Sequence, residues 1–103
     1  MTVAELPIQV DHAAIARFCE ERGIHKLSLF GSVLREDFDP PNSDVDVLAE
    51  FDPGVLQQVG FNYFGYGEEL AAILGHKVDF CSRLHPLIFD RVRDELFPLY
   101  ERT

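Results

Sequence analysis

The chain has 103 residues, which is the size of one domain. A domain of this size buries roughly 65% of the surface that its unfolded chain exposes, so it needs neither metals nor disulfides to build a core. It carries 9 Lys and Arg against 18 Asp and Glu, a formal net charge of −9. Autonomous binding of long DNA or RNA needs a basic face, and this charge balance argues against it.

The sequence gives no sign of a membrane or of secretion. No apolar run approaches the ~18 residues of a membrane span. Residues 1–12 do not combine a basic segment with an apolar core, as a secretory signal does. Cys19 and Cys81 lack metal-type spacing, and Cys19 falls on an apolar helix stripe, where a buried thiol is expected. We therefore expect a cytoplasmic protein with one domain over residues 1–103.

The first two predicted elements are a helix and a strand. Asp11 is typical of a helix cap, and the helix that it begins runs to about Arg22, with Gly23 as its stop. Residues 24–30 then alternate apolar and polar side chains, which predicts a strand.

The next segment turns the chain twice before a second strand. Ser32 is expected to cap a short turn of helix through residues 33–35. Residues 37–43 contain two prolines and an asparagine, which predict a loop. The run DVDVLAEF predicts a strand over residues 44–51.

Two helices and a strand complete the predicted order. A helix is expected over 59–74, although the glycines in its front half each cost about 1 kcal/mol there. A strand is predicted over 77–81, and a last helix over 86–97 that Pro98 ends. Three apolar residues of that last helix are expected to face inward: Phe89, Val92 and Leu96. Helices and strands thus alternate, which predicts an α/β domain with about four helices covering about three main strands.

Three aspartates stand where strands normally avoid them. Asp44 and Asp46 are two residues apart and point to the same face, about 6.6 Å apart along a strand. Asp79 likewise projects away from the apolar side chains on either side of it. If the second and third strands are neighbours, three carboxylates converge, and like charges that close raise each other's pKa values. Mg²⁺ or Mn²⁺ would neutralise them.

A second candidate feature is an anion site at the end of the first strand. The Gly31-Ser32 turn offers backbone N–H groups and a hydroxyl to a phosphate, and Arg35 is one turn away. Such a cradle facing metal-binding carboxylates is typical of nucleotidyl or phosphoryl transfer. In the alternative interpretation Asp44 is a turn residue, the other aspartates face water, and Arg35 forms a surface salt bridge to Glu36 or Asp39.

With these motifs the chain resembles the minimal nucleotidyltransferases of the DNA polymerase β superfamily. Their signature is an apolar strand, Gly-Ser, about ten residues, Asp-x-Asp and a third acidic residue on a later strand. Here Leu29-Phe30-Gly31-Ser32 is followed by eleven residues, then Asp44-Val45-Asp46 and later Val78-Asp79-Phe80. The resemblance covers nearly the whole chain and implies the α+β fold of that superfamily, with a small mixed sheet.

The resemblance also implies a mechanism. Asp44 and Asp46 would bind two Mg²⁺ ions (Mn²⁺ is the alternative), and Asp79 would complete the second metal site. An acceptor hydroxyl would attack the α-phosphate of a nucleoside triphosphate, with ATP as the expected substrate. The nucleotide-binding residues that go with this assignment are Gly31, Ser32, Arg35 and Ser43.

Small members of this family resemble antitoxins that are encoded beside a HEPN-type helical RNase toxin. The resemblance implies transfer of AMP from ATP to a tyrosine of that toxin. The aromatic stretch Phe61, Tyr63, Phe64 and Tyr66 is either core plus loop or the surface that contacts such a partner. Two alternatives stay open: a binding module that masks a toxin by contact alone, and a transferase for a small molecule such as an aminoglycoside. The second would need a homodimer to complete its pocket.

Overall fold

The structure is a computed structural model that describes residues 6, 8–35, 38–39 and 42–102. Within these residues four α-helices, two short 3-10 helices and four strands are present. In chain order they are α1 (His12–Arg22), β1 (Ile24–Phe30), η2 (Gly31–Leu34), β2 (Val45–Phe51), α2 (Leu56–Val59), η3 (Gly60–Asn62), α3 (Tyr63–Leu74), β3 (Val78–Cys81), α4 (Pro86–Val92) and β4 (Phe97–Glu101). None of the helices in the described part is long and apolar enough to span a bilayer.

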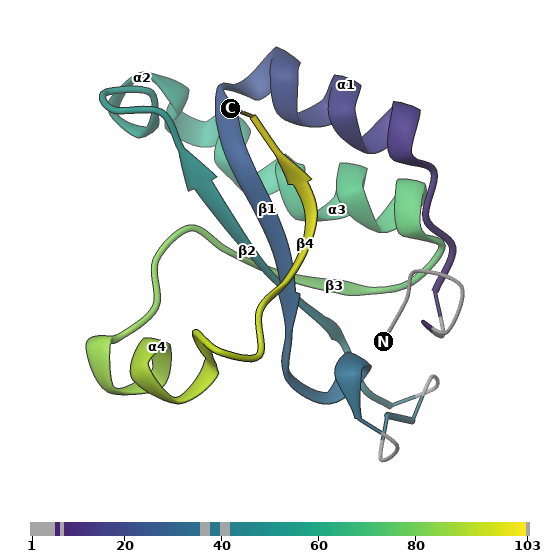
Figure 1. Cartoon of the computed structure of the whole chain (residues 1–103). Coiled ribbons are helices and arrows are strands. Elements are labelled where there is room, and N and C mark those ends of the chain that lie inside the picture. The colour runs from purple at the N-terminus through teal and green to yellow at the C-terminus, as the bar shows by residue number, and fades with distance from the viewer. Residues whose placement is uncertain (1–5, 7, 36–37, 40–41, 103) are drawn as a thin grey trace.

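The four described strands form one mixed sheet in the order β3-β2-β1-β4 (Figure 1). β1 pairs with β2 and with β4 in the antiparallel sense, whereas β2 and β3 are parallel. The predicted fold class is confirmed, and the predicted neighbourhood of the second and third strands is found. The sheet has one strand more than the sequence predicted.

The additional strand is the main correction to the predicted elements. The prediction of a helix over 86–97 was wrong at its C-terminal end, because α4 stops at Val92 and β4 begins at Phe97. Pro98 lies inside β4, where a proline is tolerated since β4 is at the edge of the sheet. The expected inward position of Phe89 was also wrong, because that side chain is exposed, while Val92 is buried as expected.

Two further boundaries differ from the predicted ones. The helical segment before β3 begins at Leu56 rather than at 59, and it is interrupted at Gly60, whose φ of 61° is incompatible with a continuous α-helix. Ser32 does not cap a helix, because η2 starts one residue earlier and has no side-chain cap. The two prolines of the predicted 37–43 loop, at 40–41, lie outside the described residues.

The first helix is as predicted. The Asp11 carboxylate accepts a hydrogen bond from the backbone N–H of Ala14 at 3.1 Å, so it satisfies one of the free donors at the helix start. Gly23 ends the helix in the left-handed conformation, with φ of 70°.

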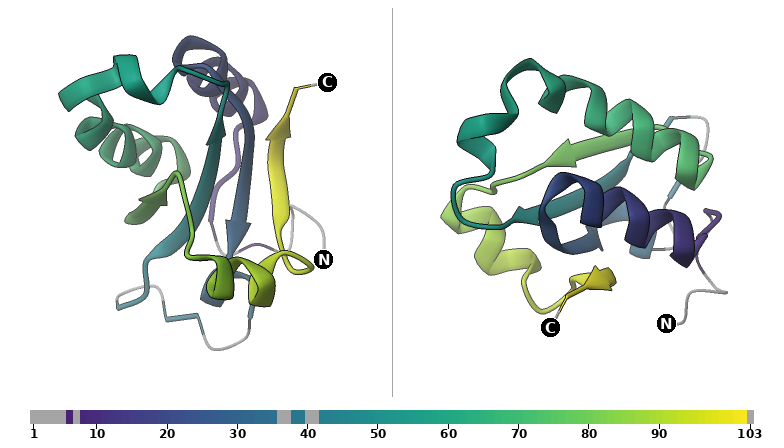
Figure 2. Two further views of the ribbon diagram at one scale, coloured as in Figure 1. Left: turned by 90° about the vertical axis from the view of Figure 1, so that its left-hand side faces the viewer. Right: turned by 90° about the horizontal axis from the view of Figure 1, so that it is seen from above.

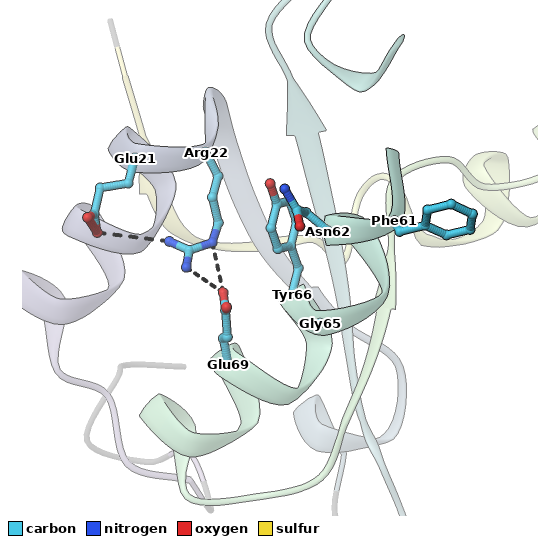
Figure 3. A pocket seen from close by; sticks show the side chains of 7 residues that line it. All are labelled: Glu21, Arg22, Phe61, Asn62, Gly65, Tyr66 and Glu69. Atoms are coloured by element: carbon cyan, nitrogen blue, oxygen red, sulfur yellow. Dashed lines mark hydrogen bonds and ion pairs between the residues drawn. The ribbon is translucent and has the colours of Figure 1, made fainter. Parts of the chain in front are cut away.

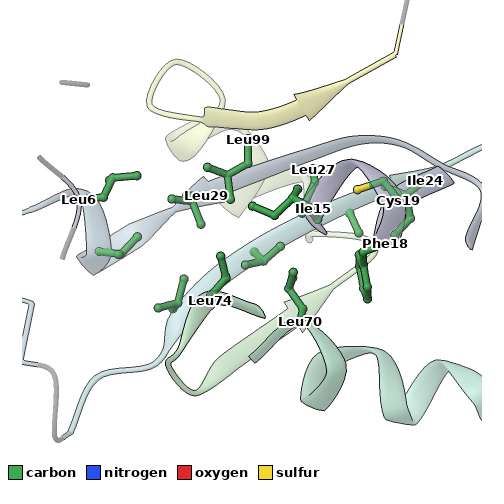
Figure 4. Close-up of a cluster of buried hydrophobic side chains, with 14 residues drawn as sticks. Leu6, Ile15, Phe18, Cys19, Ile24, Leu27, Leu29, Leu70, Leu74 and Leu99 are labelled. Carbon is green, nitrogen blue, oxygen red and sulfur yellow. The ribbon is translucent and has the colours of Figure 1, made fainter. Parts of the chain in front are cut away.

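The two faces of the sheet are covered differently (Figures 1 and 2). α1 and α3 lie side by side over one face and enclose the main core, which Figure 4 shows. Its fully buried members include Ile15, Cys19, Ile24, Leu27, Leu29, Val45, Val47, Leu70 and Leu74. Among the described residues, α4 covers the other face at one end, where its Val92 packs with Phe30 and Leu48. Two of the aspartates predicted to act in catalysis, Asp46 and Asp79, belong to this second, more open face.

Candidate active site

Strand register brings two of the three predicted aspartates together. β2 and β3 are paired in parallel with Asp46 opposite Asp79, so both side chains leave the same face of the sheet. The two residues that flank Asp46 in β2, Val45 and Val47, are fully buried in the main core. Burial of these valines fixes the register of β2 and therefore holds Asp46 on the open face.

Gly31 completes this cluster from the end of β1. Its φ is 79°, a left-handed conformation that favours glycine. A Cβ atom at this position would lie 2.3 Å from Oδ2 of Asp46. The absence of a side chain therefore lets the Asp46 carboxylate lie directly against the turn that follows β1. This contact joins the Gly-Ser motif to the Asp-x-Asp motif.

The environment of Asp46 disfavours its negative charge. Partial burial is the largest cause that raises its pKa above the ordinary value, followed by repulsion from Asp79 and then from Asp44. A hydrogen bond to Asp79 acts in the same direction, and the positive charge of Arg35 acts against it. The structure thus concentrates negative charge at one place on an open face, where a cation would relieve the repulsion.

The chemistry of these side chains suits a hard cation such as Mg²⁺, which prefers carboxylate oxygens. Asp46 and Asp79 lie opposite each other in the sheet, while Asp44 immediately precedes β2 and is half-buried. As the side chains stand, the described residues include no group of three or more His, Cys, Asp or Glu that would hold a metal ion. The carboxylate oxygens are therefore suitable ligands for a hard cation, and Asp46 and Asp79 are the two side chains best placed to hold one.

The predicted nucleotide-binding residues occupy the same end of the sheet. The Ser32 carbonyl accepts a hydrogen bond from the Arg35 N–H at 2.9 Å, which closes η2. The exposed Arg35 guanidinium is 3.4 Å from the carboxylate of Glu95. The predicted alternative partners of Arg35 were Glu36, which lies outside the described residues, and Asp39, which is engaged elsewhere.

Ser43 stabilises the loop before β2. Its Oγ accepts a hydrogen bond from the backbone N–H of Asp39 at 3.1 Å, and its own N–H donates to the Asp39 carbonyl at 2.6 Å. Asn42 also donates to the Asp39 carboxylate, at 2.7 Å. Ser43 thus fixes the chain one residue before Asp44.

Cys81 lies beside Asp79, a position that its place in the sequence did not lead us to expect. Its Sγ is 4.0 Å from Oδ1 of Asp79, and its pKa is raised by burial and then by Asp79 and Asp46. The signal in the sequence was the spacing, because residues two apart in a strand share a face. The raised pKa keeps this thiol protonated and makes it a poor nucleophile.

The aromatic stretch before β3 divides into two parts. Tyr63 and Tyr66 pack against Phe80, with ring centroids 5.6 and 6.2 Å away. Phe61 and Phe64 instead point outward, with 90% and 76% of their surfaces exposed. The tyrosines therefore belong to the packing between α3 and the sheet, and the phenylalanines belong to the surface.

A cavity of about 460 Å³ lies between the end of α1 and the start of α3, and none of the three aspartates lines it (Figure 3). Arg22 crosses it to Glu69, with Nε 3.0 Å from Oε2, and lies 4.2 Å from the centre of the Phe18 ring. Phe61 and Tyr66 also line this cavity. Because its central cation already has carboxylate and aromatic partners, the cavity is explained by the packing of α1 on α3.

Comparison with known proteins agrees with this geometry. The sequence model of the family described as "Nucleotidyltransferase domain" matches residues 13–98. The match extends from α1 into β4 and includes Gly31, Ser32 and all three aspartates. The comparison with curated proteins finds no match. On the strength of the family match over most of its length, the chain belongs to the nucleotidyltransferase domain family.

Proposed function

We propose that the chain is a Mg²⁺-dependent enzyme that transfers AMP from ATP to a hydroxyl of a partner protein. The observation that carries this proposal is the register of Asp46 with Asp79, next to a turn whose Gly31 leaves room for the Asp46 carboxylate. The family match supports nucleotidyl transfer as the reaction class. The donor and the acceptor are inferred from the resemblance described above, and the residue roles from that resemblance together with the geometry of the site.

The proposed reaction is an in-line displacement. The acceptor oxygen forms a bond to the α-phosphorus of ATP, the bond from that phosphorus to the oxygen bridging to the β-phosphorus breaks, and pyrophosphate leaves. The hydroxyl proton passes to Asp79, the aspartate on the outermost strand of this edge of the sheet, and from there to water. The acceptor residue gains one AMP group, and no oxidant or reductant is needed.

The residues divide this work between them. Asp44, Asp46 and Asp79 would hold Mg²⁺, which when bound supplies charge neutralisation for the triphosphate and for pyrophosphate. Gly31 and Ser32 would receive the triphosphate at the turn, with Arg35 as an additional positive charge nearby and Ser43 holding the loop that leads into β2. Positioning and charge stabilisation account for most of the catalysis in such a site.

The acceptor that we propose is a helical RNase toxin of the HEPN type, which AMP transfer would silence. This assignment rests on the resemblance to small antitoxin transferases and on the net charge of −9, which disfavours a nucleic acid primer as acceptor. We place the reaction in the cytoplasm, where ATP and such a toxin are both present.

Label transfer tests the proposal. The chain is incubated with Mg²⁺, the helical protein that co-purifies from its native host, and ATP labelled in the α- or in the γ-phosphate. We expect the α-label alone to appear on the partner, and the double variant Asp44→Ala/Asp46→Ala to transfer none. A tight complex without label in both proteins would instead indicate a neutraliser that acts by contact. Label on an added aminoglycoside but not on the partner would indicate a small-molecule transferase.

A further inference from the structure

The two edges of the sheet differ in their capacity to accept another strand. β4 forms one edge and contains Pro98, which has no N–H to donate. β3 forms the other edge, has no proline, and no strand in the described part of the chain pairs with its outer side. Alternate residues of β3 therefore direct N–H and C=O groups away from β2, where an extended peptide can pair with them.

The same edge carries the catalytic candidate Asp79. In a sheet, residues directly opposite each other point to the same face, with Cβ atoms about 4.5–5.5 Å apart. A residue of an added strand opposite Asp79 would therefore lie beside Asp79 on the open face. Only β3 would separate the added strand from β2, which carries Asp46. The edge of β3 thus offers a way to place an acceptor hydroxyl at the carboxylates.

The opposite face of this edge offers sites for the neighbouring side chains. A groove of about 260 Å³ lies between α3 and β3, and its lining residues are Tyr63, Phe64, Gly67, Glu68, Val78 and Phe80. Residues on either side of the acceptor would point to this face, because side chains alternate along a strand. Gly67 allows the close approach of α3, since a Cβ there would be 3.3 Å from the Cβ of Phe80.

From this arrangement we infer that β3 is the docking edge for the acceptor, which binds as an extended segment and adds a fifth strand to the sheet. The segment has a hydroxyl residue flanked by apolar residues that enter the groove beside Phe64. It also carries Lys or Arg, because Glu68 borders the groove and Asp79 with Asp46 lies on the other face. The inference rests on the proposed function and specifies the surface that its partner occupies.

Two exposed phenylalanines supply a matched test of the groove. Phe64 lines the groove beside β3, whereas Phe61, three residues earlier, lines the cavity around Arg22. The probe is a blocked synthetic peptide of sequence Lys-Val-Tyr-Val-Lys, offered with MgATP. Loss of a well-packed aromatic contact in Phe64→Ser is expected to raise the KM for the peptide about tenfold. The KM for ATP should not change, and Phe61→Ser should behave as wild type.

Edge pairing is tested separately by methylating the peptide backbone. One peptide carries N-methyl groups on its odd-numbered amides and a second on its even-numbered amides, with identical side chains. Only one set of amides faces β3, so one peptide should lose acceptor activity and the other should keep it. Equal behaviour of the two peptides, or equal KM values for the two phenylalanine variants, would overturn the docking edge.

Transfer to the co-purifying protein but not to the unmethylated peptide would also overturn the docking edge and would leave the proposed function standing. Absence of transfer to either acceptor would count against the proposed function itself.

Discussion

At the scale of single residues, the site depends on a glycine that has two separate reasons to be glycine. Gly31 has a positive φ, and its missing Cβ makes room for the Asp46 carboxylate. Gly54 has a similar φ of 84°, but a Cβ there would have no neighbour within 4 Å. The pair therefore separates the effect of backbone strain from the effect of contact with the site.

Replacement of Gly31 should consequently affect the chemistry more than the fold. Gly31→Ala and Gly54→Ala should each lose about 1–2 kcal/mol of unfolding free energy, because both place a Cβ in a left-handed conformation. Gly31→Ala should in addition lower the transfer rate at least about tenfold, since displacing a reacting group is costly for catalysis. Denaturant unfolding and initial rates of label transfer measure the two effects. Equal transfer rates in the two variants would show that the contact with Asp46 has no role.

The pKa of Asp46 leads to a second prediction at this scale. Because this pKa is raised in the folded state by burial and by Asp79, the folded chain binds the proton more tightly than the unfolded chain. Stability therefore decreases as pH rises from the unfolded pKa through the folded one. Asp46→Asn does not ionise, so it should have a higher Tm than wild type at pH 7. The difference should shrink below about pH 4. A Tm at pH 7 equal to or below that of wild type would contradict this account.

At the scale of elements, the sequence predicted most of what positions the site. The alternation of apolar and polar residues over 24–30 and the run over 44–51 predicted β1 and β2. In the structure both faces of these strands are buried over 27–30 and 47–49. The convergence of Asp46 with Asp79 followed from the assumption that their strands are neighbours. The pairing of β2 with β3 depends on tertiary contacts, so from the sequence we could only assume it.

The elements that the sequence missed have physical reasons as well. Pro98 is a strong signal for a break in both helices and strands, and only the sheet order shows that β4 is an edge where it is tolerated. Cys81 was overlooked although it is two residues from Asp79 in β3, a spacing that places both side chains on one face. The pairing of Arg35 with Glu95 joins residues 60 positions apart, which local spacing does not reveal.

The corrected C-terminal strand gives a prediction about stability. Leu99 lies in β4 and is only 7% exposed, whereas Leu87 lies in α4 and is 69% exposed. Leu99→Ala should lose about 2–5 kcal/mol of unfolding free energy through the cavity that it leaves. Leu87→Ala should stay within about 0.5 kcal/mol of wild type. Urea unfolding of both variants checks the difference, and similar losses would argue against β4 as part of the core.

At the scale of the whole molecule, one face of the sheet forms the core and the other carries the candidate site. α1 and α3 bury one face and fix the register of the strands, while α4 covers only one end of the other. The open remainder of that second face holds Gly31, Asp46 and Asp79 at neighbouring strands. Folding of the core thus creates the carboxylate cluster, even though burial of these aspartates opposes their charge.

The central claim is that Asp46 and Asp79 act together in nucleotidyl transfer. The most direct measurement is the initial rate of transfer from α-labelled ATP for Asp46→Asn and Asp79→Asn, with the exposed Asp90→Asn on α4 as control. Loss of a charge-stabilising group in such a site lowers the rate by about 10²–10³, so we expect both site variants to fall by that amount and the control to match wild type. A rate above about a tenth of wild type in Asp46→Asn, with its fold intact, would contradict the account.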